Sequence, residues 1–128
     1  MDSLIDAVKR KYPHLADKIV VTSDKNSETG ELKFQNQRYY LWFSQEKEGG
    51  FIIGINFLHS HFDLNDDQTN FDDALEYIDE IITDKIVAIG LTKEEKNFHL
   101  ASMDREAGIK AYTQEKPNVE IVSFTKEY

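Results

Sequence analysis

Several residue types are scarce in this chain, and each absence removes a class of structure or chemistry. The 128 residues contain no cysteine, so neither a disulfide framework nor thiolate catalysis is available. No apolar run approaches the roughly 18–20 residues of a membrane-spanning helix, and the N-terminus lacks the basic-then-apolar pattern of a signal peptide. The sequence has no Gly-x-Ser-x-Gly motif and no glycine-rich phosphate loop. We therefore expect a cytoplasmic protein with no membrane partner, no cofactor and no catalytic residues that can be identified.

The most informative absence is that of positive charge in one segment. Between Glu48 and Asp84 there are ten Asp and Glu and no Lys or Arg, whereas the rest of the chain has fourteen acids and fifteen bases. The whole formal net charge of −9 therefore comes from this segment. Such a charge disfavours nucleic acid as a partner, because phosphate binding depends on Lys and Arg. It suits a basic protein partner or a divalent cation.

The residues that are present are typical of a folded globular protein. Hydrophobic residues make up 40% of the chain and aromatic residues 12%, and the length is that of one domain over residues 1–128. Hydrophobic periodicity predicts helices over residues 3–12 and 71–83. Strands are predicted over residues 18–23, 31–35, 38–45, 51–63, 86–92, 97–103 and 118–125. For residues 103–112 two interpretations stay open: a short helix capped by Ser102 or Asp104, or a hairpin.

Short loops between consecutive strands favour antiparallel pairing. We therefore predict the α+β class, with an antiparallel sheet of about five to seven strands and two or three helices packed on one of its faces. The aromatic strand over residues 38–45 suits a central position, or one whose outer face meets another molecule.

The strand predicted over residues 51–63 leads into the clearest amphipathic helix. Alternation places Phe51, Ile53, Ile55 and Phe57 on one buried face, which His59, His61 and Asp63 would extend toward the end of the sheet. In the helix, Asn70 is the predicted N-cap. The apolar stripe consists of Phe71, Ala74, Leu75, Ile78, Ile81 and Ile82. The opposite side carries Asp72, Asp73, Glu76, Asp79 and Glu80.

Two histidines at positions i and i+2 of a strand raise the possibility of a zinc site. Their side chains would lie within about 7 Å of each other, and Asp63 or a carboxylate at the helix start could supply a third ligand. The structural alternative is that the histidines pack at the end of the sheet.

The same segment resembles the motif of JAMM-type zinc isopeptidases, which is His-Ser/Thr-His-Pro followed six or seven residues later by Ser-x-x-Asp. Here His59-Ser60-His61-Phe62 precedes Thr69-Asn70-Phe71-Asp72 by six residues, so phenylalanine and threonine replace the family's proline and serine. The resemblance implies that His59, His61 and Asp72 bind zinc and activate a water. It also implies an upstream general base, for which Glu31, Glu46 and Glu48 are the candidates.

A calcium loop is a further metal hypothesis. Asp63, Asn65, Asp67 and Thr69 match the first half of an EF-hand loop. Gln68 and Ala74 stand where that loop needs a glycine and a bidentate glutamate, so a specific EF-hand site is not predicted.

The charge on the acidic helix favours an interaction surface over a merely solvated one. An exposed helix ordinarily mixes acids with bases at i,i+4 spacing, but all the charges on this helix are negative. Asp79, Glu80 and Asp84 also lie near the helix C-terminus, where the dipole disfavours anions. A basic partner would explain both features. The predicted contact residues are Asp66, Asp67, Asp72, Asp73, Glu76 and Glu80, with Tyr77 as an aromatic anchor.

The chain as a whole resembles the immunity proteins of bacterial polymorphic toxins. The resemblance is carried by RYYLWFS, by the segment from GINFLHSHFDL into FDDALEYIDEIITDKIV, and by the closing VEIVSFTKEY. It implies a protein that binds a cognate toxin domain, often a basic one, and inhibits it by occlusion without a cofactor or catalysis. A structural or regulatory module that uses an exposed sheet face is the remaining alternative, and the oligomeric state stays open.

Overall fold

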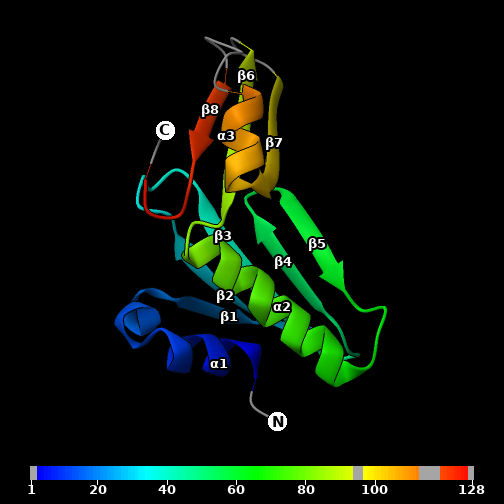
Figure 1. The fold of residues 1–128 in the computed structure, drawn as a ribbon. Helices are drawn as coiled ribbons and strands as arrows, with labels where there is room; N and C mark the ends of the chain where they lie inside the picture. The colour runs from blue at the N-terminus through cyan, green and yellow to red at the C-terminus, as the bar shows by residue number, and fades with distance from the viewer. Residues whose placement is uncertain (1–2, 94–96, 113–118, 127–128) are drawn as a thin grey trace.

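The computed structural model describes residues 3–93, 97–112 and 119–126, which form two antiparallel sheets with helices packed against them (Figure 1). The class is α+β, as predicted. In chain order the elements are α1 (Leu4–Lys11), a 3₁₀ helix η1 (Pro13–Lys18), β1 (Val20–Ser23), β2 (Ser27–Lys33), β3 (Tyr40–Glu46), β4 (Phe51–Ile55), β5 (Leu58–Phe62), α2 (Asp67–Ile82), β6 (Ile86–Lys93), β7 (Asn97–Asp104), α3 (Arg105–Tyr112) and β8 (Val119–Val122).

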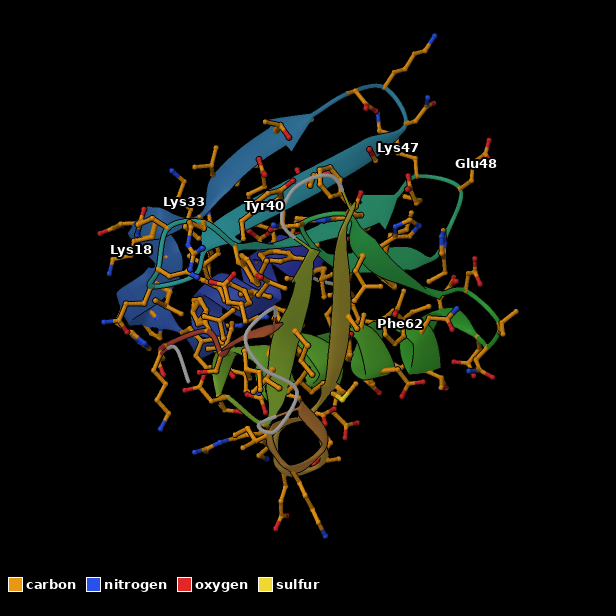
Figure 2. The ribbon with its side chains drawn as sticks, turned by 90° about the horizontal axis from the view of Figure 1, so that it is seen from above. Lys18, Lys33, Tyr40, Lys47, Glu48 and Phe62 are labelled. Carbon is orange, nitrogen blue, oxygen red and sulfur yellow. The ribbon has the colours of Figure 1, made fainter. Side chains whose placement is uncertain are left out.

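The larger sheet has the strand order β1-β2-β3-β4-β5, and all neighbours are antiparallel. The aromatic strand β3 is central, as its composition suggests. Helices α1 and α2 cover one face of this sheet, which we call the inner face (Figure 1). Figure 2 shows Lys33 and Tyr40 on the opposite, outer face, and Phe62 on the side of α2.

The core lies between the inner face and the two helices. The sheet contributes the buried residues Leu32, Leu41, Phe43, Phe51, Ile53 and Ile55. The helices contribute Leu4, Ile5, Ala7 and Val8 from α1 and Phe71, Ala74, Ile78, Ile81 and Ile82 from α2. The Phe51 and Phe71 rings meet edge to face, with centroids 5.8 Å apart. Each large side chain buried here stabilises the fold by roughly 1.5–3 kcal/mol, so the predicted apolar stripe of α2 is a main source of stability.

The strand predicted over residues 51–63 is in fact a hairpin. Strand β4 ends at Ile55, Asn56 and Phe57 form a two-residue turn, and β5 runs back from Leu58. Neither Asn56 nor Phe57 is a glycine, the residue that usually marks such a turn. Asn56 takes the left-handed conformation instead, with a φ of 51°. Asparagine tolerates this conformation better than most residues because its short polar side chain can bond to nearby backbone. The Asn56 Oδ1 also accepts the Tyr40 N–H at 2.9 Å.

The reversal changes which residues face the core. Phe57, expected on the buried face, is 85% exposed at the tip of the turn. His59 and His61 lie opposite Gly54 and Ile52, on the outer face of the sheet. They do not extend the buried face, which corrects the prediction made from alternation alone.

The smaller sheet has the strand order β7-β6-β8, and α3 packs against it. Its own small core consists of Val87, Ile89 and Ile121, with Met103 and Ile109 beside them. Residues 105–112 are helical, which decides between the two interpretations of that segment. Asp104 is the capping residue, since its Oδ1 accepts the Ala107 N–H at 3.1 Å.

Helix α2 begins one turn earlier than predicted, because Asp66 caps it. The Asp66 carboxylate accepts the Thr69 N–H at 2.9 Å and the Thr69 hydroxyl at 2.8 Å. Asn70, the predicted cap, is buried inside the helix and holds Asn65 through two hydrogen bonds. The Thr69 N–H, followed by the Thr69 hydroxyl, lowers the pKa of the Asp66 carboxyl below its usual value of 3.8.

This cap gives a pH-dependent prediction. Asp66→Ala should lower the midpoint of thermal unfolding by a few degrees at about pH 7, because a helix cap is lost. A carboxyl whose pKa is lower in the folded state stabilises the protein above its unfolded pKa, and this contribution is lost as the pH falls through the folded value. The difference between the variant and wild type should therefore shrink at about pH 2.5, measured by circular dichroism. The control is Asp73→Ala, which removes an exposed carboxylate from the same helix. If Asp66→Ala lowered the unfolding midpoint equally at both pH values, the capping role would be contradicted.

Candidate functional site

The exposed side of α2 forms a continuous acidic face. It consists of Asp72, Asp73, Glu76 and Glu80, which point away from the sheet; the first three are exposed and Glu80 is half-buried. Helix α2 contains no Lys or Arg. Within the part of the chain that the structure describes, none of these four carboxylates forms an ion pair. We use "acidic face" for these four residues.

Three other carboxylates of the acidic segment have structural roles. Asp66 caps α2, as described above. Asp79 accepts a hydrogen bond from the Tyr12 hydroxyl and lies 3.3 Å from Lys11 Nζ, so it ties α2 to α1. Its place near the helix C-terminus therefore has a structural explanation.

Asp84 closes the C-terminal end of α2. The Lys85 N–H donates to Glu80 O at 2.8 Å and the Asp84 N–H to Ile81 O at 3.2 Å, which is a Schellman motif. Asp84 takes the left-handed position, with φ at 65°, where glycine is usual. Its carboxylate holds Thr125 through the backbone N–H and the hydroxyl, so it ties down the segment after β8. Of the three acids near this helix end, only Glu80 has no such role.

The remaining predicted contact residues differ in what they offer a partner. Asp67 is exposed in the first turn of α2, next to the acidic face along the chain. Tyr77 is half-buried: its ring packs on Phe62 with centroids 5.6 Å apart, and its hydroxyl lies 2.9 Å from Ser102 Oγ. Tyr77 therefore joins α2 to the smaller sheet, and we do not treat it as an anchor for a partner.

The structure does not bring the zinc ligands suggested by the JAMM resemblance together. His59 and His61 lie on the outer face of the larger sheet, with ring centroids 5.1 Å apart. Asp72 lies on α2, which packs on the inner face, and on the side of that helix turned away from the sheet. Asp63 is near His61, with 4.0 Å between Oδ2 and Nδ1. Among the residues described, no three His, Asp or Glu side chains converge as a metal site.

The segment that resembles half an EF-hand loop is closed by its own hydrogen bonds. The Asp66 carboxylate is engaged by Thr69, and Asn65 and Asn70 bond to each other. The local geometry is that of a helix cap.

Trp42 forms an aromatic row with the histidines on the outer face. The indole lies across Gly54, so closely that a Cβ at Gly54 would be 2.3 Å from Trp42 Cε2. Its Nε1 donates to Asn56 O at 2.8 Å, and its ring is 6.0 Å from that of His59. A glycine at this point of β4 is therefore required for the tryptophan to lie flat on the sheet.

This packing leads to a second prediction. Gly54→Ala should lower the free energy of unfolding by about 2–3 kcal/mol, because the new methyl displaces the indole and breaks its hydrogen bond. Since Trp42 is the only tryptophan, its emission should shift to the red at the same time. Chemical denaturation followed by circular dichroism measures the loss. In a Trp42→Ala background the same glycine substitution should cost much less, and an undiminished cost there would refute the packing argument.

A cavity of about 590 Å³ lies where η1, β2 and the segment after β8 meet. Its lining includes Lys18 and Lys33, which no sequence motif marks as binding residues. The lining residues come from three separate stretches, residues 15–20, 31–40 and 124–125, and no local pattern connects them. Only the tertiary fold reveals this site.

No described helix is both long enough and apolar enough to cross a membrane. Comparison of the chain with protein-family models, with curated proteins and with solved structures found no match. The function is therefore inferred from the surfaces of this chain itself.

Proposed function

We propose that this protein binds a basic protein partner through the acidic face of α2 and neutralises it by occlusion, as the immunity proteins that its sequence resembles neutralise their toxins. The observation that carries the proposal is the acidic face itself: four exposed or half-exposed carboxylates of one sign, without a neutralising partner in the described part of the chain. Helix α2 has 16 residues and is therefore about 24 Å long, enough to span much of a small partner's binding site.

The electrostatics of the acidic face suit rapid capture of a cation-rich surface. Neighbouring carboxylates repel one another in the free protein, and a basic partner relieves that repulsion. Complementary charge also raises the rate of encounter and disfavours wrong partners. The acids with structural roles, Asp66, Asp79 and Asp84, are not needed for this contact.

A groove at the C-terminal end of α2 adds a concave feature beside the acidic face. It has a volume of about 780 Å³ and a lining of mixed charge. The lining holds the acids Glu80, Asp84, Asp104 and Glu106 and the bases Lys85, Arg105 and Lys110. Asp84 and Asp104 already accept hydrogen bonds from Thr125 and Ala107, so Glu80 and Glu106 are the carboxylates of this groove that we expect a basic side chain of the partner to meet.

The proposed encounter is cytoplasmic, and a chain without cysteine suits that reducing compartment.

The zinc hydrolase alternative is not supported by any contact in the structure, since its three ligands lie on two sides of the sheet. If the acidic face is merely solvated, reversing its charge should not change the binding of any partner. If it is a binding face, the same reversal should weaken binding.

Affinity capture from the source cells tests the proposal. The wild-type protein should retain a basic protein that Asp73→Lys/Glu76→Lys fails to retain. Asp17→Lys/Glu48→Lys is the matched control, because both residues are exposed, lie outside α2 and give the same change in net charge. Retention of the same partner by both double variants would overturn the assignment of the acidic face.

Neutralisation is tested separately with the captured partner. Expression of the partner alone should arrest growth, and co-expression of the wild-type chain should restore it. Restoration by the control variant but not by Asp73→Lys/Glu76→Lys is the expected pattern. If the partner is harmless when expressed alone, the binding proposal still holds but the immunity function is contradicted.

A further inference from the structure

The cavity between η1, β2 and the segment after β8 differs in character from the rest of this acidic protein. Its floor is apolar, made by Leu15, Leu32, Phe34 and Phe124. Its volume of about 590 Å³ falls within the ~300–1,000 Å³ range of small-molecule sites. No residue of α2 lines it, so it is separate from the acidic face.

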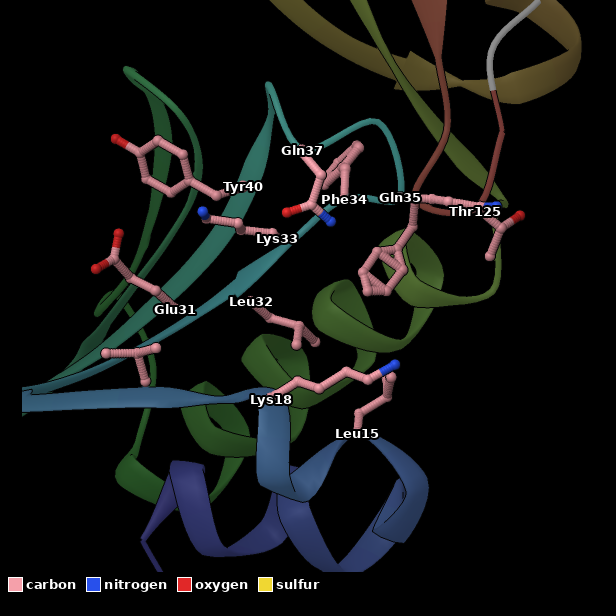
Figure 3. A pocket seen from close by; sticks show the side chains of 12 residues that line it. Leu15, Lys18, Glu31, Leu32, Lys33, Phe34, Gln35, Gln37, Tyr40 and Thr125 are labelled. Carbon is pink, nitrogen blue, oxygen red and sulfur yellow. The ribbon is translucent and has the colours of Figure 1, made fainter.

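Two lysines border the cavity from different elements. Lys18 comes from η1 and Lys33 from β2, and Figure 3 shows them on different sides of the opening. Both are exposed, and neither has an ion-pair partner in the described residues. Glu31 is the one acid in the lining. In a chain with a net charge of −9, this opening therefore has an excess of positive charge.

The edge of β2 adds backbone groups to the site. On the edge of β2 that pairs with β1, the pairing ends where Val20 lies opposite Glu31, and β2 continues beyond this point to Lys33. Further along the same edge, the Gln35 N–H donates to Phe124 O at 2.9 Å. The Phe34 N–H points the other way, to Tyr39 O. Because alternate residues of a strand point to opposite edges, the N–H and C=O of Lys33 face the opening between β1 and Phe124.

We propose that this cavity binds a small organic anion that has an apolar body and a single carboxylate or sulfonate. The apolar body would cover the floor, and the acid group would pair with a lysine at the rim. Side-chain amides of Gln35 and Gln37 and the Lys33 N–H are further donors for the acid oxygens. A neutral ligand of the same shape would leave these donors and both lysine charges unused.

Two fluorescent probes that differ in one group test this proposal. 8-Anilinonaphthalene-1-sulfonate is anionic, and N-phenyl-1-naphthylamine has the same rings without the sulfonate. The folded wild-type protein should bind the sulfonate saturably and more tightly than the neutral probe. Adding the sulfonate should shift the amide NMR signals of Lys33, Gln35 and Thr125. Shifts confined to another part of the protein, or no saturable binding of the sulfonate, would overturn the site.

Charge variants then test the role of the lysines. Lys18→Met/Lys33→Met should weaken sulfonate binding about tenfold and leave the neutral probe within about twofold. Glu31→Gln should tighten sulfonate binding and leave both the neutral probe and the midpoint of thermal unfolding unchanged, which distinguishes the gain from sulfonate binding by a partly unfolded protein. Lys25→Met/Lys47→Met removes the same charge from exposed turns outside the cavity and should change nothing. Equal sulfonate affinity in wild type and Lys18→Met/Lys33→Met would refute the proposal, and the single variants show which lysine holds the acid.

Discussion

Replacing Phe43 with alanine is expected to lower the free energy of unfolding by about 3–5 kcal/mol. Phe43 is completely buried in the central strand β3, on the face covered by α1 and α2. Its ring lies so close to Gly30 that a Cβ there would be 2.7 Å from Phe43 Cε2. The surrounding strands cannot close the space that the ring leaves, so a cavity cost adds to the lost burial. Since small proteins are stable by only about 5–15 kcal/mol, this loss would bring the fold near its limit.

Phe57→Ala is the matched control, because it makes the same chemical change at an exposed position. Phe57 is 85% exposed in the turn between β4 and β5, so its loss should change stability by less than about 0.5 kcal/mol. Chemical denaturation followed by circular dichroism and by Trp42 emission compares the two variants. Similar losses for Phe43→Ala and Phe57→Ala would show that the arrangement of strands given above is wrong.

Reversal of the whole acidic face is expected to slow association with the basic partner by about 100-fold at low salt. The variant replaces Asp72, Asp73, Glu76 and Glu80 with lysine, so an attractive field becomes a repulsive one. Surface charges act mainly on the association rate, and salt screens them over about 10 Å at 0.1 M. The measurement is stopped-flow or biosensor kinetics of the purified pair over a series of salt concentrations.

The salt series provides its own control. The difference between wild type and the reversed variant should shrink as salt rises, whereas a variant that is merely misfolded stays slow at every salt concentration. An association rate that is unchanged at low salt would exclude the acidic face from the encounter.

The fold class could be predicted from the sequence because alternation and helical periodicity are local signals. The hairpin of β4 and β5 could not, since Asn56-Phe57 carries none of the usual glycine signals and the apolar alternation runs straight through it. The left-handed Asn56 becomes evident only when its side chain is seen bound to Tyr40. Missing this one turn placed His59 and His61 on the wrong face.

The division of the strands into two sheets has a similar explanation. Each predicted strand has its own local pattern, but whether β6 pairs with β4 or with β8 depends on contacts between distant segments. The sequence likewise identified the acidic helix and could not separate its acids by role. Asp79 and Asp84 find their partners in α1 and in the segment after β8, far away along the chain. The four residues of the acidic face have no such tertiary partner in the described part of the chain.

Carboxyl footprinting of the complex shows whether the acidic face contacts the basic partner. Carbodiimide coupling of glycine ethyl ester labels accessible carboxylates, and mass spectrometry locates the label. In the free protein, Asp72, Asp73, Glu76 and Glu80 should be labelled, together with Asp17 and Glu48. In the complex with the basic partner, the four residues of the acidic face should be protected while Asp17 and Glu48 stay reactive. Full labelling of the acidic face in a saturated complex would show that the partner binds elsewhere.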